Sequence, residues 1–149
     1  MNRLNISRIG IGLFYLVSSF FNLFHTMNNT QYLWIVCLEN VRFSFQTQFL
    51  EKIVIPNEKF IVLLIVIFEI IVGLFILSKG LFVKIGLILG IFWVLSIATF
   101  LPLDDILGHI GLGVLHALLL MGNYDTTFWE IIKSIKKIQK SDYSRITYL

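Results

Sequence analysis

Residues 60–101 read FIVLLIVIFEIIVGLFILSKGLFVKIGLILGIFWVLSIATFL, and this stretch decides the fold. Two long apolar runs, 60–77 and 81–101, are separated only by the tripeptide at 78–80. A membrane-spanning helix needs about 20 predominantly apolar residues. Because lipid offers backbone groups no hydrogen-bond partners, each segment must satisfy its own groups as a helix. The stretch therefore predicts two spanning helices joined by a tight turn.

Two further apolar runs, at 6–24 and 106–121, flank this hairpin in the sequence. Of the 149 residues in the chain, 57% are hydrophobic and 14% are charged, whereas about 25% charged residues is usual for soluble domains. The mean hydropathy is +0.85. These values exclude a disordered chain and argue against a soluble globule. We expect an all-α fold, an integral membrane four-helix transmembrane bundle, over residues 1–125.

Basic residues gather on one side of the expected membrane domain. Nine of the 12 Lys and Arg residues fall on that side if both termini share it. They are Arg3, Arg8, Lys79, Lys84, Lys133, Lys136, Lys137, Lys140 and Arg145. The positive-inside rule then places both termini in the cytoplasm. The net charge of +3 is small and lies on this side, so we expect no nucleic-acid partner.

Residues 26–59 connect the first two spans and carry aromatic side chains among polar ones. A connection of this length with its own apolar content is usually structured or functional. Two interpretations are open. The segment is either a helix anchored by its aromatic residues in the outer membrane interface, or a lid or partner-docking surface over the bundle.

Residues 126–149 read as a basic, amphipathic, cytoplasmic tail. Thr127 and Glu130 have the spacing of a capping box that opens a helix. The membrane-surface candidates in this tail are Trp129, Lys133, Lys136, Lys137 and Lys140. Such a helix is expected to bind the anionic inner leaflet of the bilayer, with docking of a cytoplasmic protein as the alternative.

Glu69 and His116 lie near the middle of the second and fourth expected spans. An ionisable residue at the centre of a spanning helix costs about 2.5–3.5 kcal/mol on insertion scales, so both side chains must face the bundle. Both spans run from the outside inward, which puts the two residues at similar depth. If these two spans are neighbours, we predict that the side chains form a hydrogen-bonded pair, which is either catalytic or a structural lock between the helices.

Further polar residues gather in the outer half of the spans, where they predict a ligand pocket that opens outward. They are Ser18, Asn22, Ser96 and His109. Single Ser side chains usually bond their own helix backbone, which is the structural alternative. Glu69, His109 and His116 are suitable metal ligands by type. The seven-residue spacing of the two histidines is looser than the i,i+4 spacing of helical metal sites, so we predict no metal site.

Gly86 and Gly90 form a GxxxG motif in the third apolar run. Such residues let helices approach closely, and both packing within the bundle and a dimer interface are open. Cys37 is the single cysteine, which excludes a disulfide within the chain and any CxxC redox or zinc motif.

Residues 68–74, FEIIVGL, resemble a mid-helix glutamate with glycine four residues on, as found in the DoxX-like family of small four-helix bacterial membrane proteins. Residues 79–80 are similar to that family's short basic turn, and residues 8–12 resemble the arginine that opens its first helix. The resemblance implies a multi-pass protein of the bacterial cytoplasmic (inner) membrane. It also implies a subunit of a membrane oxidoreductase system, linked in some members to thiosulfate oxidation and quinone reduction.

Three functions are then open. The first is a redox-associated membrane subunit with a quinone or other small-molecule pocket in the outer half, because carboxyl and imidazole groups can bond a quinone carbonyl and relay its proton. With one cysteine and no cofactor motif, this chain needs a partner subunit to supply electrons. The second is a small proton- or cation-coupled transporter that uses Glu69 and works as a homo-oligomer. The third is a non-catalytic scaffold or accessory subunit.

Overall fold

The computed structural model describes residues 3–134, 136 and 137. Over these residues the chain is helical and contains no strand. Four helices are long and apolar enough to cross a membrane. They are α1 (Arg3–Phe24), α4 (Glu58–Leu77), α5 (Leu81–Ala98) and α6 (Leu103–Leu120). The prediction of an all-α chain with four long apolar helices is confirmed.

Two helix boundaries differ from the expected ones because of a single proline. Pro102 adopts an extended conformation, with φ −52° and ψ 151°, and it has no N–H to continue a helix. α5 therefore ends at Ala98 rather than at residue 101, and α6 begins directly after the proline instead of at residue 106. Acidic residues suit the positive end of the α6 dipole, and Asp104 and Asp105 lie in its first turn.

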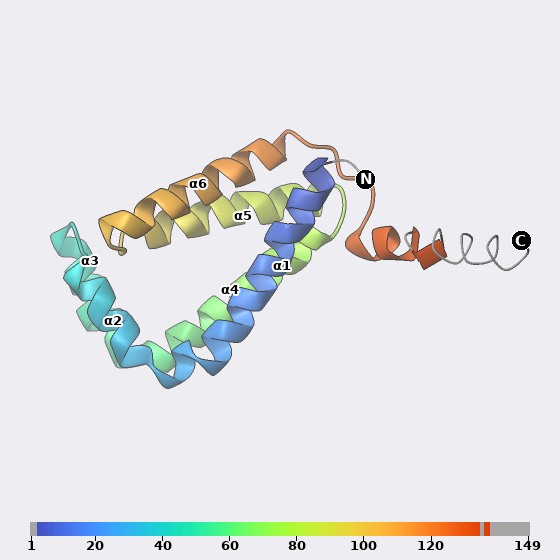
Figure 1. Cartoon of the computed structure of the whole chain (residues 1–149). Helices are drawn as coiled ribbons and strands as arrows, with labels where there is room; N and C mark the ends of the chain where they lie inside the picture. The colour runs from blue at the N-terminus through green and yellow to red at the C-terminus, as the bar shows by residue number, and fades with distance from the viewer. Residues whose placement is uncertain (1–2, 135, 138–149) are drawn as a thin grey trace, which may run out of the picture.

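The four long helices form two arms that diverge from one end (Figure 1). α1 packs along α4, α5 packs along α6, and the turn at 78–80 joins the two arms. We call the end that contains this turn the turn end, and the opposite end the bridged end. The long helices alternate in direction, so the start of α1 and the end of α6 meet at the turn end (Figure 1). The placement of both termini on one side of a membrane stays a prediction.

The connection between the two helices of the first arm is folded. It contains α2 (Thr30–Glu39) and α3 (Ser44–Phe49), and the short turns η1 (Thr26–Asn28), η2 (Leu50–Val54) and η3 (Ile55–Asn57). Arg42 donates hydrogen bonds to the carbonyl oxygens of Thr99 at 2.9 Å and Leu101 at 2.8 Å, beyond the end of α5. Gln46 Nε2 donates to Thr99 Oγ1 at 3.0 Å. These bonds tie the segment to the second arm, which favours the lid interpretation.

Two apolar clusters hold the molecule together. The first joins all four long helices and is centred on Tyr15, Val72, Ile76, Leu87 and Leu119. The second lies under α2 and α3 and contains Trp34, Cys37, Leu50, Val54 and Val62. The second cluster joins the connecting segment to α4, while other apolar side chains of the segment, among them Tyr32 and Phe45, are exposed.

Two glycines of α5 are required by close packing. A methyl carbon at Gly86 would lie 2.9 Å from the backbone nitrogen of Ile76 in α4. A methyl carbon at Gly90 would lie 2.6 Å from His116 Nε2 and 2.8 Å from Tyr15 Oη. The GxxxG motif therefore serves packing within this chain, with Gly90 at the point where α1, α5 and α6 meet.

Candidate functional site

A pocket of about 360 Å³ lies between α1, α4, α5 and α6. Four of the six intramembrane candidates from the sequence line it, namely Ser18, Asn22, Glu69 and His109. Much of the remaining lining is aromatic, from Phe14, Phe21 and Trp93. Polar side chains that stand 40 or more residues apart in the sequence thus converge on one apolar-walled pocket. We call it the polar pocket.

Glu69 is the most deeply buried acid of the polar pocket, with 5% of its surface exposed. Asn22 Nδ2 donates to Glu69 Oε2 at 2.8 Å, and Thr26 Oγ1 donates to Asn22 Oδ1 at 2.8 Å. Trp93 provides a further donor toward the carboxyl group. Because Thr26 occupies the amide oxygen, the amide nitrogen of Asn22 must face Glu69. The carboxyl group is therefore held in a fixed orientation at the pocket wall.

His116 is completely buried, but it does not bond Glu69. Its Nδ1 lies 2.7 Å from the carbonyl oxygen of Leu112, and because a carbonyl only accepts, Nδ1 carries the proton. Its Nε2 has no hydrogen-bond partner among the described residues. The predicted hydrogen bond between Glu69 and His116 is therefore wrong. Glu69 faces α1, and the ring of Tyr15 packs edge-on against the imidazole with centroids 5.7 Å apart.

The remaining sequence candidates divide between two places. His109 lines the polar pocket, and its Nδ1 lies 3.0 Å from the carbonyl oxygen of Asp105 one helical turn earlier. Ser18 also lines this pocket. Ser96 lines a second, apolar cavity on the other side of Trp93. The sequence thus predicted four residues that line the polar pocket, whereas Ser96 lines the other cavity.

Tyr15 is a buried polar residue of the pocket that sequence reasoning missed. Its side chain is 1% exposed, and its hydroxyl donates to the carbonyl oxygen of Gly90 at 3.3 Å. It lies between the pocket and His116, since it lines the former and packs on the latter. A signal was present, because Arg8, Tyr15 and Asn22 are seven residues apart and so share one face of α1.

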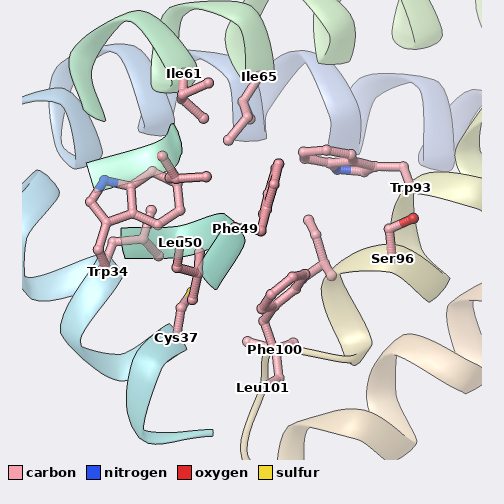
Figure 2. Close-up of a pocket in the computed structure, with 13 residues that line it drawn as sticks. Trp34, Cys37, Phe49, Leu50, Ile61, Ile65, Trp93, Ser96, Phe100 and Leu101 are labelled. Atoms are coloured by element: carbon pink, nitrogen blue, oxygen red, sulfur yellow. The ribbon is translucent and has the colours of Figure 1, made fainter. Parts of the chain in front are cut away.

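The second cavity lies beneath the connecting segment and has a volume of about 370 Å³ (Figure 2). α2, α3 and η2 form one wall, and α4 and α5 form the others. Its lining is apolar apart from Ser96 and Cys37. Burial raises the pKa of the Cys37 thiol to about 11. We call it the apolar cavity.

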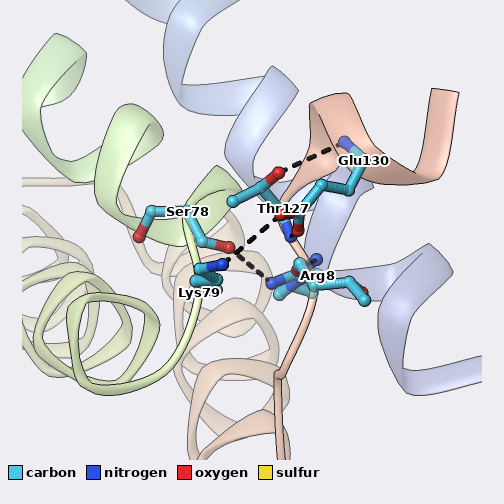
Figure 3. Close-up of polar contacts among 6 residues, drawn as sticks. Arg8, Ser78, Lys79, Thr127 and Glu130 are labelled. Carbon is cyan, nitrogen blue, oxygen red and sulfur yellow. Dashed lines mark hydrogen bonds and ion pairs between the residues drawn. The ribbon is translucent and has the colours of Figure 1, made fainter. Parts of the chain in front are cut away.

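The turn end is fastened by a buried arginine (Figure 3). Arg8 is completely buried, with Nη1 donating to the carbonyl oxygen of Ser78 at 2.8 Å and Nη2 to that of Thr126 at 3.1 Å. Its guanidinium carbon lies 4.9 Å from the centre of the Tyr124 ring. Arg8 therefore joins the first helix to the turn and to the segment after α6. It differs from the other basic residues at this end, because it is not a surface charge.

The predicted capping box after α6 is confirmed. The Thr127 N–H donates to Glu130 Oε2 at 2.7 Å, and the Glu130 N–H donates to Thr127 Oγ1 at 3.2 Å. Lys79 Nζ lies 3.3 Å from Glu130 Oε1 (Figure 3). Hydrogen bonds from the Thr127 N–H and from Lys79 lower the pKa of Glu130 below its usual range. A helix follows over residues 128–134.

Of the predicted membrane-surface residues, Trp129, Lys133, Lys136 and Lys137 are exposed. Lys140 lies outside the described residues. Within the described part of the chain, no three His, Cys, Asp or Glu side chains lie close enough to share a metal ion. No protein-family model matches the sequence, and comparisons with curated proteins and with solved structures find no match.

Proposed function

We propose that this protein is a membrane subunit that binds a quinone-like, lipid-soluble molecule, with the head group of the ligand in the polar pocket. The observation that carries the proposal is the Glu69 carboxyl group, fixed by Asn22 at the wall of a pocket that is otherwise mostly apolar. An ionisable group at the middle of an apolar helix is expensive and usually marks a functional site. A neutral carboxyl group costs less there than an ionised one and can donate a hydrogen bond.

The chemistry of the lining suits a quinone head group. Such a ring has two carbonyl oxygens that accept hydrogen bonds and two apolar faces that pack against aromatic rings. The pocket offers a donor from α4, the neutral Glu69 carboxyl group, and aromatic surface from Trp93. His109 from α6 directs its Nδ1 proton at the carbonyl oxygen of Asp105, so its Nε2 is an acceptor that suits the hydroxyl group of a reduced quinone. Its volume of about 360 Å³ falls in the range of small-molecule pockets, about 300–1,000 Å³.

The membrane setting belongs to the same proposal. We place the four long helices across a bacterial cytoplasmic membrane, with the turn end and both termini in the cytoplasm. The clustering of basic residues at the turn end supports this orientation. The polar pocket and the connecting segment then lie in the outer half. The resemblance of residues 68–74 to the DoxX-like glutamate motif supports association with an oxidoreductase system, in which a partner subunit supplies the electrons.

Tryptophan fluorescence tests the head-group site directly. The chain has three tryptophans, and Trp34→Phe with Trp129→Phe leaves Trp93 as the only reporter, at the pocket wall. In lipid nanodiscs, a fully ring-substituted benzoquinone without a tail should quench Trp93 saturably. Glu69→Leu should abolish the saturable component, while Glu69→Gln should keep it, because its amide still donates.

The matched control is Glu51→Gln, which removes an exposed carboxyl group from the connecting segment. It should leave quenching unchanged. Quenching that is linear in quinone concentration, and equal in the parent and in Glu69→Leu, would show that quinone only dissolves in the lipid around the protein. That result would refute the proposed function.

A further inference from the structure

Binding of a head group in the polar pocket leaves the apolar cavity without a role. Its walls come from the connecting segment and from both arms, and Figure 2 shows the Phe49 ring projecting into the space between Ile65 and Phe100. Buried side chains of the segment close one wall, with Trp34 7% and Leu50 2% exposed. The volume of about 370 Å³ matches that of the polar pocket.

The two sites share a wall. Trp93 and Ile97 line the polar pocket on one side and the apolar cavity on the other. Both are on α5 and stand four residues apart, one helical turn. The polar pocket and the apolar cavity are therefore adjacent, with the side chains of this turn of α5 between them. The polar pocket suits the head group of an amphiphile, and the adjacent apolar cavity suits its hydrocarbon tail.

We propose that the apolar cavity binds the hydrocarbon tail of the molecule whose head group occupies the polar pocket. This inference rests on the proposed function, because the head group at Glu69 sets the position of the tail. A cavity lined by apolar side chains offers water too few partners and favours hydrocarbon. In a bilayer the alternative surroundings of the tail are also apolar, so specificity comes from packing against the walls rather than from exclusion of water.

The connecting segment is the lid of this tail site. Arg42 donates to the carbonyl oxygens of Ala98, Thr99 and Leu101, and Gln46 bonds Thr99, so the segment is latched to the end of α5. The latch holds the wall that carries Cys37 and Leu50 against the cavity. A tail bound there is separated from the aqueous phase by the folded segment.

Cys37 is a built-in reporter, because it lines the cavity and is the only cysteine in the chain. The experiment measures its rate of labelling by N-ethylmaleimide in nanodiscs at pH 9, where a thiol of pKa about 11 is about 1% ionised. The probes are a fully substituted benzoquinone with a ten-carbon chain and the same head group with a methyl group instead. Full substitution of the ring prevents addition of the thiol to the quinone.

The tailed quinone should slow the labelling of Cys37 at least fivefold, and the tail-less quinone should leave the rate unchanged while still quenching Trp93. Ser96→Phe places a ring in the cavity and should remove the protection by the tailed quinone. Ile88→Phe is the control, because Ile88 is 44% exposed on the same helix and lines neither site. In the Ile88→Phe variant, the tailed quinone should slow the labelling of Cys37 as much as in the parent protein.

The outcomes separate this inference from the proposed function. If both quinones quench Trp93 but neither protects Cys37, the tail site is refuted and the head-group site stands. If the tail-less quinone protects Cys37 as well as the tailed one, the head group occupies the apolar cavity and the inference is again refuted. If neither quinone binds and a phospholipid alone protects Cys37, the cavity holds a lipid chain, and both the occupant proposed here and the proposed function are wrong.

Discussion

Asn22 and Glu69 form a 2.8 Å hydrogen bond that crosses from α1 to α4 over 47 residues of sequence. The bond gives the Glu69 carboxyl group a partner within the first arm, and Trp93 of α5 provides a further donor. Thr26, the first residue of η1, completes the set by donating to Asn22 at 2.8 Å. The first arm therefore carries a preformed polar unit, and the second arm adds the rest of the pocket around it.

Removal of one partner of the hydrogen bond between Asn22 and Glu69 should lower the stability of the protein more than removal of both partners. Glu69→Leu leaves the half-buried Asn22 amide without its acceptor, and we expect the protein to lose about 1–3 kcal/mol of stability. The double variant Asn22→Leu with Glu69→Leu should recover part of this loss, because two apolar groups replace two bonded ones. Unfolding in detergent measures both, with Glu51→Gln as the neutral control. Additive effects of the two substitutions would show that the bond contributes nothing.

Gly90 should be intolerant of even one added methyl group. Gly90→Ala brings a carbon within 3 Å of His116 Nε2 and Tyr15 Oη, which belong to buried side chains. We expect a loss of about 1–3 kcal/mol, as is typical for overpacking. Gly111→Ala is the matched control, because nothing lies within 4 Å of that site and alanine favours helix. Thermal unfolding compares the two, and equal melting temperatures would contradict the packing described here.

The capping box after α6 should weaken in acid. The pKa of Glu130 is lowered in the folded chain, chiefly by the Thr127 N–H and also by Lys79. The contribution of Glu130 is therefore complete above its unfolded pKa and is lost as the pH falls through the lower, folded value. The amide resonance of Thr127, followed by NMR, should titrate with a midpoint below 4.5. Lys79→Gln should move the midpoint upward, and an unchanged midpoint would exclude a role for the ion pair.

The proposed orientation can be tested in intact spheroplasts. A protease-cleavable tag after Leu149 should resist protease added outside, because the basic turn end lies in the cytoplasm. The same tag inserted after Asn40, in the connecting segment between α2 and α3, should be cut. Cutting of the C-terminal tag alone would reverse the assigned orientation.

The long helices were predictable because a membrane-spanning segment is a property of one run of residues. Length and hydropathy locate α1, α4, α5 and α6, and only the ends shift where Pro102 interrupts. The capping box at Thr127 and Glu130 is equally local and was also predicted correctly. A signal carried by residues within about one helical turn can be recognised in the sequence without knowing how the helices pack.

The partners of buried polar groups were not predictable in the same way. The depth of Glu69 follows from its place in the run, but the helix that it faces depends on how the two arms pack. Asn22 from α1 takes the place that His116 was expected to hold. The path of residues 26–57 was also left open, because its contacts with α4 and α5 are tertiary.

Arg8 has a consequence for the order of synthesis. Its two carbonyl partners, Ser78 and Thr126, lie 70 and 118 residues later in the chain. When the first helix leaves the ribosome, its guanidinium group has no internal acceptor, and the second of its two acceptors is made only after α6. The burial of Arg8 between its two acceptors can therefore be completed only after the last helix is made. A chain that stops before residue 126 leaves this arginine half satisfied, which gives quality control a means to recognise an unfinished product.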